Sequence, residues 1–429
     1  NRWEVKTIPS QTLPMRESTG RKSQNRMTMI PNYLAKANQI GDTLSELREA
    51  FHRRPELGNQ EFQTAARIES VLQDCALEVT RPLPTAVVGT LKGGRPGPTV
   101  AIRADMDALP ILEQTGAPFA SQNPGVMHAC GHDIHIANLL TVAYILCKNR
   151  DKFPGTVKLI FQPAEEAANP DNPHAGAWNM VRCGCLENPK VDAMIGLHNN
   201  PAAEGHGSFG LRKGVCTSGF DLYRFDVYGK TAHGSQPHVG NDAILAVSQL
   251  IVLLQQVVSR NIDPLKTGIL SVGTIQGGTR VNIIPEFATA GGCFRYYDND
   301  TAKVIREHTL AIARGVEEIS GCKIDVTAQT GYACVENDDA LTELAEAALK
   351  EEMGEDSCFY MDMPATGSED FSEYHLVTGV PTTFMWLNTR PVEGHEVMPL
   401  HSNKWCPDSD ILRYGAPGMA AIAVKYLNS

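Results

Sequence analysis

Apolar positions recur at two spacings in the first half of the chain. A spacing of three or four residues predicts helices over residues 44–57, 61–75 and 134–147. Short β-rich runs occupy residues 87–91, 99–103, 156–161 and 193–197. Strands that alternate with helices in this way predict an α/β fold, in which a mostly parallel sheet is covered by helices on both faces.

The pattern changes near residue 215. A half-exposed strand over 220–228 is followed by a helix over 242–259, strands over 269–274 and 286–296, a helix over 300–319 and a strand over 323–330. The order β-α-β-β-α-β is typical of a ferredoxin-like α+β sandwich. We therefore predict a main domain made of residues 43–214 and 332–429, interrupted by an inserted lid over residues 215–331. Residues 1–42 are predicted to be a leader that is disordered or artificial.

The composition is that of a globular protein rather than a binder of nucleic acid or membranes. Of the 429 residues, 42% are hydrophobic and 20% are charged, and the formal net charge is −11. Nucleic acids and anionic membranes are bound through excess Lys and Arg, so neither is expected as a partner. No apolar run reaches the roughly eighteen residues that a membrane span needs. The eleven scattered cysteines favour free thiols and a reducing compartment, so we expect a cytoplasmic protein.

The densest group of candidate ligands lies in the segment MHACGHDIH, residues 127–135. Cys130 and His132 stand just before an apolar helix, so both side chains can face one point. Thiolate and imidazole bind zinc and related divalent ions strongly. A lone Cys or His is more often a buried or surface residue, but three His, one Cys and one Asp in this segment favour a metal site. A structural zinc site would need a second pair of Cys or His ligands, and none follows.

Acidic and imidazole groups also stand at the ends of three predicted strands. They are Asp105 with Asp107, Glu165 with Glu166, and His198. Such groups meet at the carboxyl ends of parallel strands. Of two adjacent carboxylates, one can bind a metal ion while the other takes a proton from water. A single histidine such as His198 or His401 is more often structural, but together with Cys130 and His132 the two supply the distal ligands of a two-metal site.

Eight motifs occur in the order RADMDALP, MHACGHDIH, QPAEEA, GLHNNP, GKTAHGSQP, VNIIPE, GSEDF and PLHSN. Together they resemble the amidohydrolase branch of the carboxypeptidase-G-like metallopeptidases, over roughly residues 43–428. This branch includes hippurate hydrolases, bacterial aminoacylases and plant auxin-conjugate hydrolases. The resemblance implies a catalytic domain of the zinc-exopeptidase type, with the ferredoxin-like insert as a lid and dimerisation domain.

The resemblance also implies two divalent metal ions per chain. The residues that match the family's ligands are Cys130 as the bridge, His132 and His198 for one ion, and Glu166 and His401 for the other. Glu165 resembles the general base, and Asp107 resembles an acid that orients a ligand. Zinc and manganese are the first candidates for the metal, and cobalt or nickel also suit mixed sulfur, nitrogen and oxygen ligands.

Further positions match residues that contact the substrate in the family. His233 resembles a lid histidine that reaches the scissile carbonyl, often from a dimer partner, and this implies a homodimer or a larger homo-oligomer. Asn282, Arg295 and Ser368 resemble substrate-binding residues. A guanidinium group offers a fork that matches a carboxylate. The alternative for Arg295 is a surface charge on an edge strand.

The predicted reaction is hydrolysis of the amide bond of a small N-acyl amino acid, which gives a carboxylic acid and a free amino acid. Glu165 would take the proton of the attacking water, while the metal and His233 stabilise the oxyanion. Two alternatives stay open: a dipeptidase or carboxypeptidase on the same scaffold, and a non-catalytic binding protein that kept the fold. The sequence names neither the acyl group, nor the amino acid, nor the native metal.

Overall fold

The structure is a computed structural model, which describes residues 33–39, 41–167 and 176–429. The predicted leader up to residue 32 lies outside the described residues. Residues 33–42 were also assigned to that leader, but they contain helix α1 (Tyr33–Gln39) and the start of α2 (Gly41–His52). Tyr33 is buried in the core of the main domain, and the Leu34 N–H donates to Glu352 Oε1 (2.8 Å). These residues are therefore part of the packed body, because apolar contacts in the fold hold a helix too short to be stable alone.

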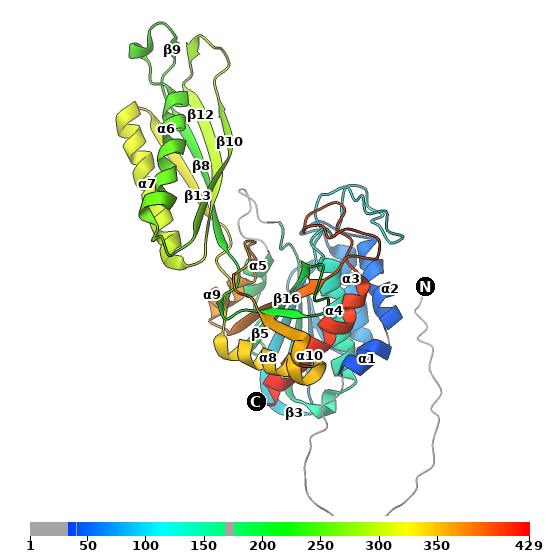
Figure 1. Ribbon diagram of the computed structural model, residues 1–429. Coiled ribbons are helices and arrows are strands. Elements are labelled where there is room, and N and C mark those ends of the chain that lie inside the picture. The colour runs from blue at the N-terminus through cyan, green and yellow to red at the C-terminus, as the bar shows by residue number, and fades with distance from the viewer. Residues whose placement is uncertain (1–32, 40, 168–175) are drawn as a thin grey trace, which may run out of the picture. The chain divides into compact units, whose positions relative to one another are not determined.

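A mixed eight-stranded sheet forms the centre of the main domain (Figure 1). Its order is β1-β2-β4-β3-β5-β16-β6-β15. The strands are β1 (Glu78–Thr80), β2 (Val87–Lys92), β3 (Arg95–Asp105), β4 (Pro154–Gln162), β5 (Ala193–Pro201), β6 (Phe209–Leu211), β15 (Cys358–Tyr360) and β16 (Thr382–Thr389). β3 is parallel to β4 and β5, and β5 is parallel to β16, whereas β2 and β6 pair antiparallel with their inner neighbours. The predicted α/β fold is confirmed, with parallel strands at its centre.

The inner strands contribute alternately to two hydrophobic cores. Ile102 and Phe161 pack in one core, and their chain neighbours Ala101 and Ile160 pack in the other. The alternation follows from the two-residue period of a strand. The first core is shared with α1, α2, α3 (Phe62–Asp74), α4 (His132–Cys147), α8 (Asp339–Met353) and α10 (Leu412–Leu427), and the second with α5 (Gly176–Arg182) and α9 (Ser372–Thr378). Helices thus cover both faces, and the carboxyl ends of the strands are left for a site.

The lid contains an antiparallel four-stranded sheet with its own hydrophobic core. The strands β8 (Gly219–Tyr228), β10 (Gly268–Gly277), β12 (Phe287–Tyr296) and β13 (Lys323–Thr330) lie in the order β10-β12-β8-β13. Helices α6 (Ala243–Gln256) and α7 (Asn299–Ser320) pack against one face of this sheet (Figure 1). The chain order β-α-β-β-α-β is the predicted one. A separate two-stranded ladder joins β9 (Ala232–His233) to β11 (Ile283–Ile284).

Two chain passages connect the lid to the main domain, and they pair with each other. Strand β7 (Gly214–Val215) is antiparallel to β14 (Glu336–Asn337). Farther toward the lid, the Phe220 N–H donates to the Tyr332 carbonyl (2.9 Å), and the Gly331 N–H donates to the Phe220 carbonyl (2.9 Å). A Cβ atom on Gly331 would lie 2.4 Å from the Phe220 ring, so only glycine permits this approach.

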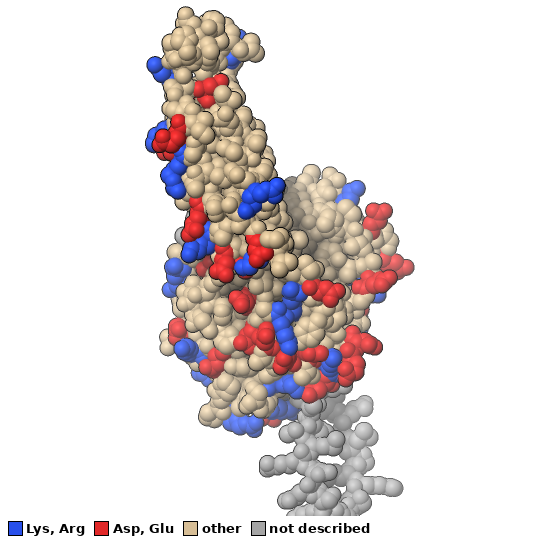
Figure 2. All heavy atoms as spheres, turned by 60° about the vertical axis from the view of Figure 1, so that its left-hand side comes forward, with Lys and Arg blue, Asp and Glu red and all other residues tan. Residues whose placement is uncertain are grey.

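The lid also holds the most apolar long helix among the described residues. α6 continues through a π-helical turn, and the stretch Ala243–Asn261 has a hydropathy of 1.6, which by length and composition alone is enough to cross a membrane. From the sequence, no run of this kind was expected. Ala246, Leu250 and Leu254 lie on the buried side of this helix and pack in the lid core, so one face already has a partner. Figure 2 shows that uncharged side chains dominate the visible surface of the lid.

Candidate active site

Three neighbouring parallel strands carry ligand-type residues to the same end of the sheet, and those that follow β4 and lie on β5 line one cavity. β3 ends at Asp105, β4 ends shortly before Glu165, and His198 lies inside β5, which continues to residue 201 rather than ending at 197 as predicted. The cavity measures about 370 Å³. Its lining includes Cys130, Glu165, Glu166, His198, Phe220, Arg295, Tyr332, Ser368, Glu369, Trp386 and His401. The position agrees with the rule that sites of α/β folds form at the carboxyl ends of strands.

Four of the predicted ligands contact one another at this cavity. The Sγ atom of Cys130 lies 3.4 Å from Nε2 of His198 and 3.3 Å from Nε2 of His401. Oε1 of Glu166 lies 2.9 Å from the same His401 nitrogen. The thiol of Cys130 therefore stands between a histidine on β5 and a histidine–carboxylate pair, which is where a bridging ligand is expected.

Unusual backbone conformations hold the loops that carry these ligands. Gly131 has a φ of +88°, and a Cβ atom there would lie 2.3 Å from the Asn199 side chain. The Asn199 amide, in the orientation that satisfies its neighbours, donates to the Cys130 carbonyl (3.1 Å). His401 has a φ of +66°, and its N–H donates to the Ala129 carbonyl (2.9 Å). The first of these bonds joins β5 to the Cys130 loop, and the second joins the His401 loop to it directly.

His132 has the orientation of a metal-binding histidine. Its Nδ1 lies 2.9 Å from the carbonyl oxygen and 3.2 Å from Oδ1 of Asp107, while its Nε2 has no hydrogen-bond partner among the described residues. Burial alone would lower the pKa of His132, but the carboxylates of Asp105 and Asp107 raise it to about 10. A carboxylate or carbonyl on one ring nitrogen typically orients the other toward a metal. Asp107 stands where the sequence analysis expected an orienting acid.

Asp105 and His135 also lie within ligand distance of His132 and His198, but their polar atoms are already used. His135 Nδ1 contacts Asp105 Oδ1, and His135 Nε2 accepts a hydrogen bond from the Asn199 N–H (3.0 Å). The second oxygen of Asp105 accepts from Arg103 Nη1 (2.6 Å). Of this group, His132 and His198 remain available to bind an ion.

The acidic side chains that are buried together at this site suit the binding of a divalent cation. Burial, followed by the Glu166 and Glu165 carboxylates, raises the pKa of the Cys130 thiol well above its usual value. Burial, followed by the Glu369 carboxylate, raises the pKa of Glu165 well above its usual value. Several acidic groups thus crowd a buried space, and a dication would favour their ionised forms. The orphaned Nε2 of His132 and the mixed sulfur, nitrogen and oxygen donors agree with a metal site.

A fully buried arginine under the site, the first residue of the motif RADMDALP, was given no role from the sequence. Arg103 Nη2 bonds to Glu369 (2.8 Å) and Asp370 (2.9 Å), and its Nε donates to Gln162 (2.8 Å). The Asp370 N–H in turn approaches Glu165 Oε1 at 3.5 Å. In the sequence, Arg103 ends an expected strand, and nothing local indicates its partners. Only the folded chain shows that it balances the acids of the GSEDF loop.

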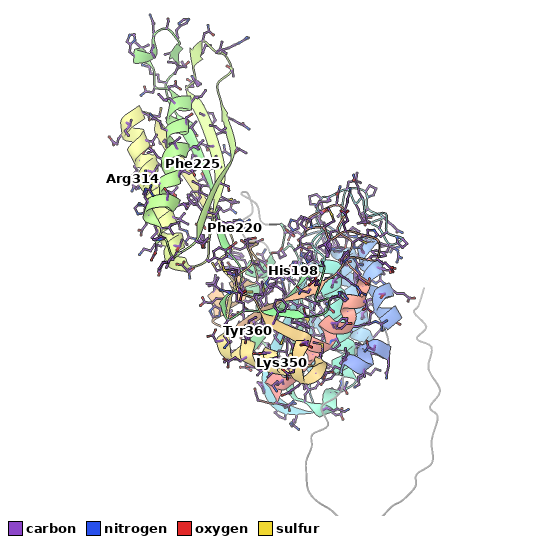
Figure 3. The ribbon with its side chains drawn as sticks, in the orientation of Figure 1. His198, Phe220, Phe225, Arg314, Lys350 and Tyr360 are labelled. Carbon is purple, nitrogen blue, oxygen red and sulfur yellow. The ribbon has the colours of Figure 1, made fainter. Side chains whose placement is uncertain are left out.

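Two predicted substrate-binding residues, Arg295 and Ser368, lie in the cavity wall. Arg295 Nη1 donates to Ser368 Oγ (2.9 Å), to the Thr366 carbonyl (3.1 Å) and to Ser218 Oγ (3.2 Å). Its guanidinium carbon lies 5.6 Å from the centre of the Phe220 ring. Figure 3 marks Phe220 on β8 and His198, which line the same cavity. Arg295 is thus fixed at the site rather than standing free on an edge strand.

The other two predicted lid residues lie elsewhere. His233 Nδ1 contacts Ser235 Oγ (2.7 Å), and the Gly234 N–H donates to the Asn282 carbonyl (2.8 Å). Arg295 is paired with Phe220 near one end of β8, whereas β9 follows the other end of that strand. The eight residue steps from Phe220 to the end of β8 span about 26 Å. His233 and Arg295 of one lid therefore cannot touch the same small molecule.

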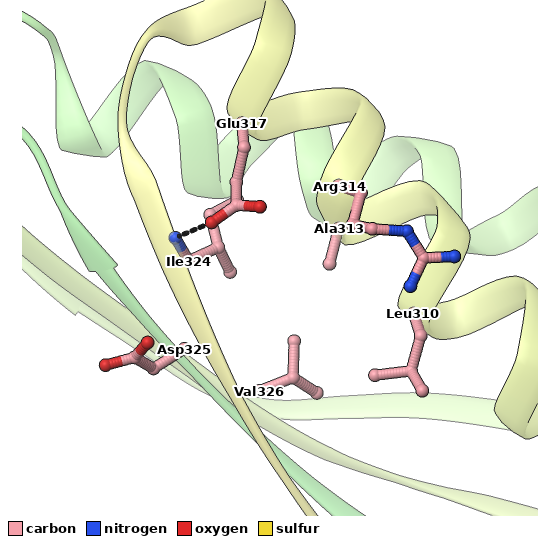
Figure 4. A pocket seen from close by; sticks show the side chains of 7 residues that line it. All are labelled: Leu310, Ala313, Arg314, Glu317, Ile324, Asp325 and Val326. Carbon is pink, nitrogen blue, oxygen red and sulfur yellow. Dashed lines mark hydrogen bonds between the residues drawn. The ribbon is translucent and has the colours of Figure 1, made fainter.

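A second hollow, of about 430 Å³, lies on the lid between α7 and β13 (Figure 4). Its charged groups are Arg314, Glu317 and Asp325, and the Glu317 carboxylate accepts the Ile324 N–H (2.7 Å). The other lining residues are Leu310, Ala313, Ile324 and Val326. These residues form no group of metal-ligating or nucleophilic side chains.

Comparison with known proteins assigns the family. The profile of peptidase family M20/M25/M40 matches residues 101–416. The chain is 36% identical over 406 residues to thermostable carboxypeptidase 1 of Saccharolobus solfataricus, covering 94% of this chain and 100% of that protein. It is 34% identical over 402 residues to the hippurate hydrolase of Campylobacter jejuni, with the same coverage. A dinuclear metal-binding M20 peptidase from Bacillus subtilis has a TM-score of 0.78 at 31% identity, covering 91% of this chain and 99% of that one.

The family match spans most of the chain, and the two relatives are matched over their full length. The site described above supplies the metal-type ligands that such enzymes need. The chain therefore belongs to peptidase family M20/M25/M40, as a metal-dependent amidohydrolase of the branch that its motifs resemble.

Proposed function

We propose that the protein hydrolyses the amide bond of N-acyl amino acids. The observation that carries this proposal is the composition of one cavity, which combines metal-type ligands, the Glu165 carboxylate and the Arg295 guanidinium. An N-acyl amino acid has a carbonyl to be attacked, an amine to leave and a free carboxylate to be recognised. The name of the hippurate hydrolase relative supports this substrate class, because hippurate is an N-acylated glycine.

Five residues would hold two divalent ions. Cys130 lies between the histidines 198 and 401 and would bridge, with His132 and His198 on one side and Glu166 and His401 on the other. When bound, such ions lower the pKa of water and polarise a carbonyl group. Zinc and manganese are the first candidates for this mixed donor set, and cobalt or nickel also suit it.

Glu165 is the proposed general base. Its carboxylate lines the cavity beside Glu166 and lies within ligand distance of Glu166 and His132. Glu165 would take the proton of the attacking water and return it to the leaving nitrogen. Neither step requires a covalent intermediate, so Cys130 would act as a ligand and not as a nucleophile.

Arg295 is proposed to bind the carboxylate of the amino acid. Among the described residues, Arg295 has hydrogen-bond partners only at its Nη1 atom, and its Nε and Nη2 atoms have none. Two parallel N–H groups match the two oxygens of a carboxylate. Ser368 would hold the guanidinium in place from the main domain.

His233 is proposed to act on the active site of a second copy of this chain. One lid cannot bring both Arg295 and His233 to the same substrate, whereas a symmetric dimer can. The lid also exposes apolar side chains, which favour burial against a partner. They include Leu245 and Val252 on α6, Ile269 and Ile275 on the edge strand β10, and Val281. We further propose a cytoplasmic location, which the free thiols of all eleven cysteines support.

A panel of substrates tests the proposed function. The metal-reconstituted enzyme is assayed with N-acetyl and N-benzoyl amino acids, with the same compounds carrying a blocked carboxylate, and with dipeptides. We expect hydrolysis of the N-acyl amino acids, at least about tenfold slower turnover when the carboxylate is blocked, and no turnover in a Glu165→Gln control. Faster turnover of dipeptides would instead support a dipeptidase or carboxypeptidase, the second candidate, which the similarity to thermostable carboxypeptidase 1 favours.

A further inference from the structure

Two residues outside the ligand set bind the backbone that carries Glu165. The N–H of Ala164 donates to Oε1 of Glu61 (2.8 Å). The carbonyl oxygen of Glu165 accepts a hydrogen bond from the Tyr332 hydroxyl. Glu61 precedes α3 and Tyr332 lies in the second passage between lid and main domain, so widely separated parts of the chain meet at this turn.

A third side chain binds the next residue of the turn. The N–H of Glu166 donates to Oδ2 of Asp107 (2.9 Å). Each residue from Ala164 to Glu166 is thus held through its backbone by a different side chain. We call these three bonds the backbone clamp. The clamp fixes a turn in which Ala164 has a φ of +58°, a left-handed conformation that is costly for a residue with a side chain.

Glu61 is placed to stabilise its own helix, yet it does not do so. It occupies the N-cap position of α3, but its side chain makes no capping bond. Glu56 caps this helix instead, because its Oε2 accepts from the N–H groups of Gln63 (3.0 Å) and Thr64 (2.8 Å). Glu61 is fully buried, and its Oε2 has no partner among the described residues. A buried, half-satisfied carboxyl is destabilising, so its contact with Ala164 calls for another role.

Tyr332 links the same turn to the lid. Its carbonyl accepts the Phe220 N–H (2.9 Å), and its ring lies edge-on to the Phe220 ring at 5.4 Å. Phe220 is part of β8 and lies beneath the guanidinium of Arg295. The hydroxyl of Tyr332 therefore contacts the turn of the proposed base, while the rest of the residue contacts the strand that carries the lid.

We propose that Glu61 and Tyr332 are positioning residues, which hold the backbone of Glu165 so that its carboxylate faces the cavity. This inference rests on the proposed role of Glu165 as the general base. For this contact the Glu61 side chain needs only an oxygen that accepts the Ala164 N–H, so its charge is dispensable there. Burial and the neighbouring Asp107 carboxylate raise the pKa of Glu61 to about 7, which agrees with a role that does not need the charge.

Three variants test the proposal. Tyr332→Phe removes only the hydroxyl, Glu61→Leu removes the acceptor, and Glu61→Gln keeps an acceptor oxygen while it removes the charge. We expect kcat for an N-acyl amino acid to fall about 10- to 100-fold in Tyr332→Phe and Glu61→Leu, with KM and metal content unchanged. Glu61→Gln is expected to stay within about threefold of the wild-type kcat, by the same principle of preserved orientation.

Matched controls separate positioning from general destabilisation. Glu56→Leu removes the carboxylate that caps α3, and Tyr296→Phe removes a buried hydroxyl that bonds Asp221 in the lid (3.1 Å). Both are expected to lower the melting temperature without changing kcat. If Tyr332→Phe retains the wild-type kcat, or if Glu61→Gln loses as much kcat as Glu61→Leu, the proposal is wrong. Because Tyr332→Phe and Glu61→Gln are close in shape to the wild type, they decide the question even if Glu61→Leu does not fold.

A second measurement does not depend on the substrate. Hydrogen–deuterium exchange of peptides that cover residues 163–167 is expected to speed up in Glu61→Leu and Tyr332→Phe, and to stay unchanged in Glu56→Leu and Tyr296→Phe. Unchanged exchange in both clamp variants would overturn the clamp itself. If the wild type hydrolysed no N-acyl amino acid but the exchange changed as expected, the proposed function would fail while the clamp would stand.

Discussion

Oε1 of Glu166 lies 2.9 Å from Nε2 of His401, although the two residues belong to distant parts of the chain. Glu166 follows β4, and His401 stands on a loop before α10 in a left-handed conformation. The His401 side chain is 51% exposed and that of Glu166 is 17% exposed, so this pair forms the solvent-facing side of the site. Cys130 lies on their inner side and is buried.

Cys130→Ala is expected to lower metal content and activity together. The thiol lies 3.4 Å from His198 and 3.3 Å from His401, so its loss removes a donor that both proposed ions share. Elemental analysis of the purified variant measures the ions per chain. Cys185→Ala is the control, since Cys185 is also buried but packs in the second core. Two ions per chain in Cys130→Ala would exclude the bridging role.

Glu165→Gln is expected to keep its metal and to lose turnover. A positioned acid or base typically contributes 10²–10⁴-fold, and Gln cannot accept the proton of water. Steady-state kinetics on protein of known metal content check this expectation, with Glu204→Gln as an exposed control. A kcat near that of the wild type, at full metal content, would remove Glu165 from the reaction.

His233→Ala is expected to reduce kcat while metal content stays intact. The separation of about 26 Å along β8 keeps this histidine away from the Arg295 end of its own lid, so it would serve a partner chain. Mixing inactive His233→Ala with inactive Glu165→Gln should restore part of the activity, because one site of each heterodimer then has both residues. His238→Ala, on a neighbouring exposed histidine, is the control. No recovery in verified heterodimers would rule out action in trans.

Arg48→Met is expected to destabilise the main domain by about 3–5 kcal/mol, because it removes the guanidinium from a buried carboxylate whose remaining side-chain partner is His52, 2.9 Å away. Arg48 Nε lies 2.6 Å from Asp133 Oδ2, and both side chains are fully buried. Urea unfolding at neutral pH measures the change. Arg53→Met breaks the half-exposed pair with Glu49 and should lower stability by less than about 1 kcal/mol. If the two variants lost equal free energy of unfolding, burial of the Arg48–Asp133 pair would not increase its contribution to stability.

Local patterns were enough to predict the order of the longer helices and strands, but not short elements such as β1, β6 and α9. The alternation in residues 220–228 and the apolar spacing of 300–319 reflect one-sided burial, which each strand or helix shows by itself. The predicted boundaries of the elements and of the main domain were less accurate. Strand β5 extends to Pro201, and helix α1 lies before residue 43, where the main domain was expected to start. The sequence of α1 is too short to reveal a helix that its contacts with α10, α4 and α8 stabilise.

The candidate ligands could be found in the sequence because their chemistry is rare and their motifs are compact. Cys130 and His132 lie in one segment, and Glu165 adjoins Glu166, so residue types and spacing alone pointed to a metal site. Glu61, Arg103 and Tyr332 gave no such signal, since each is an ordinary residue in its own helix, strand or loop. Their roles arise from contacts over long sequence distances, with Ala164, Glu369 and the carbonyl of Glu165. Only the tertiary structure showed that His233 and Arg295 lie far apart. The two residues stand near opposite ends of β8, and the length of that strand, which the order of motifs does not reveal, sets the distance between them.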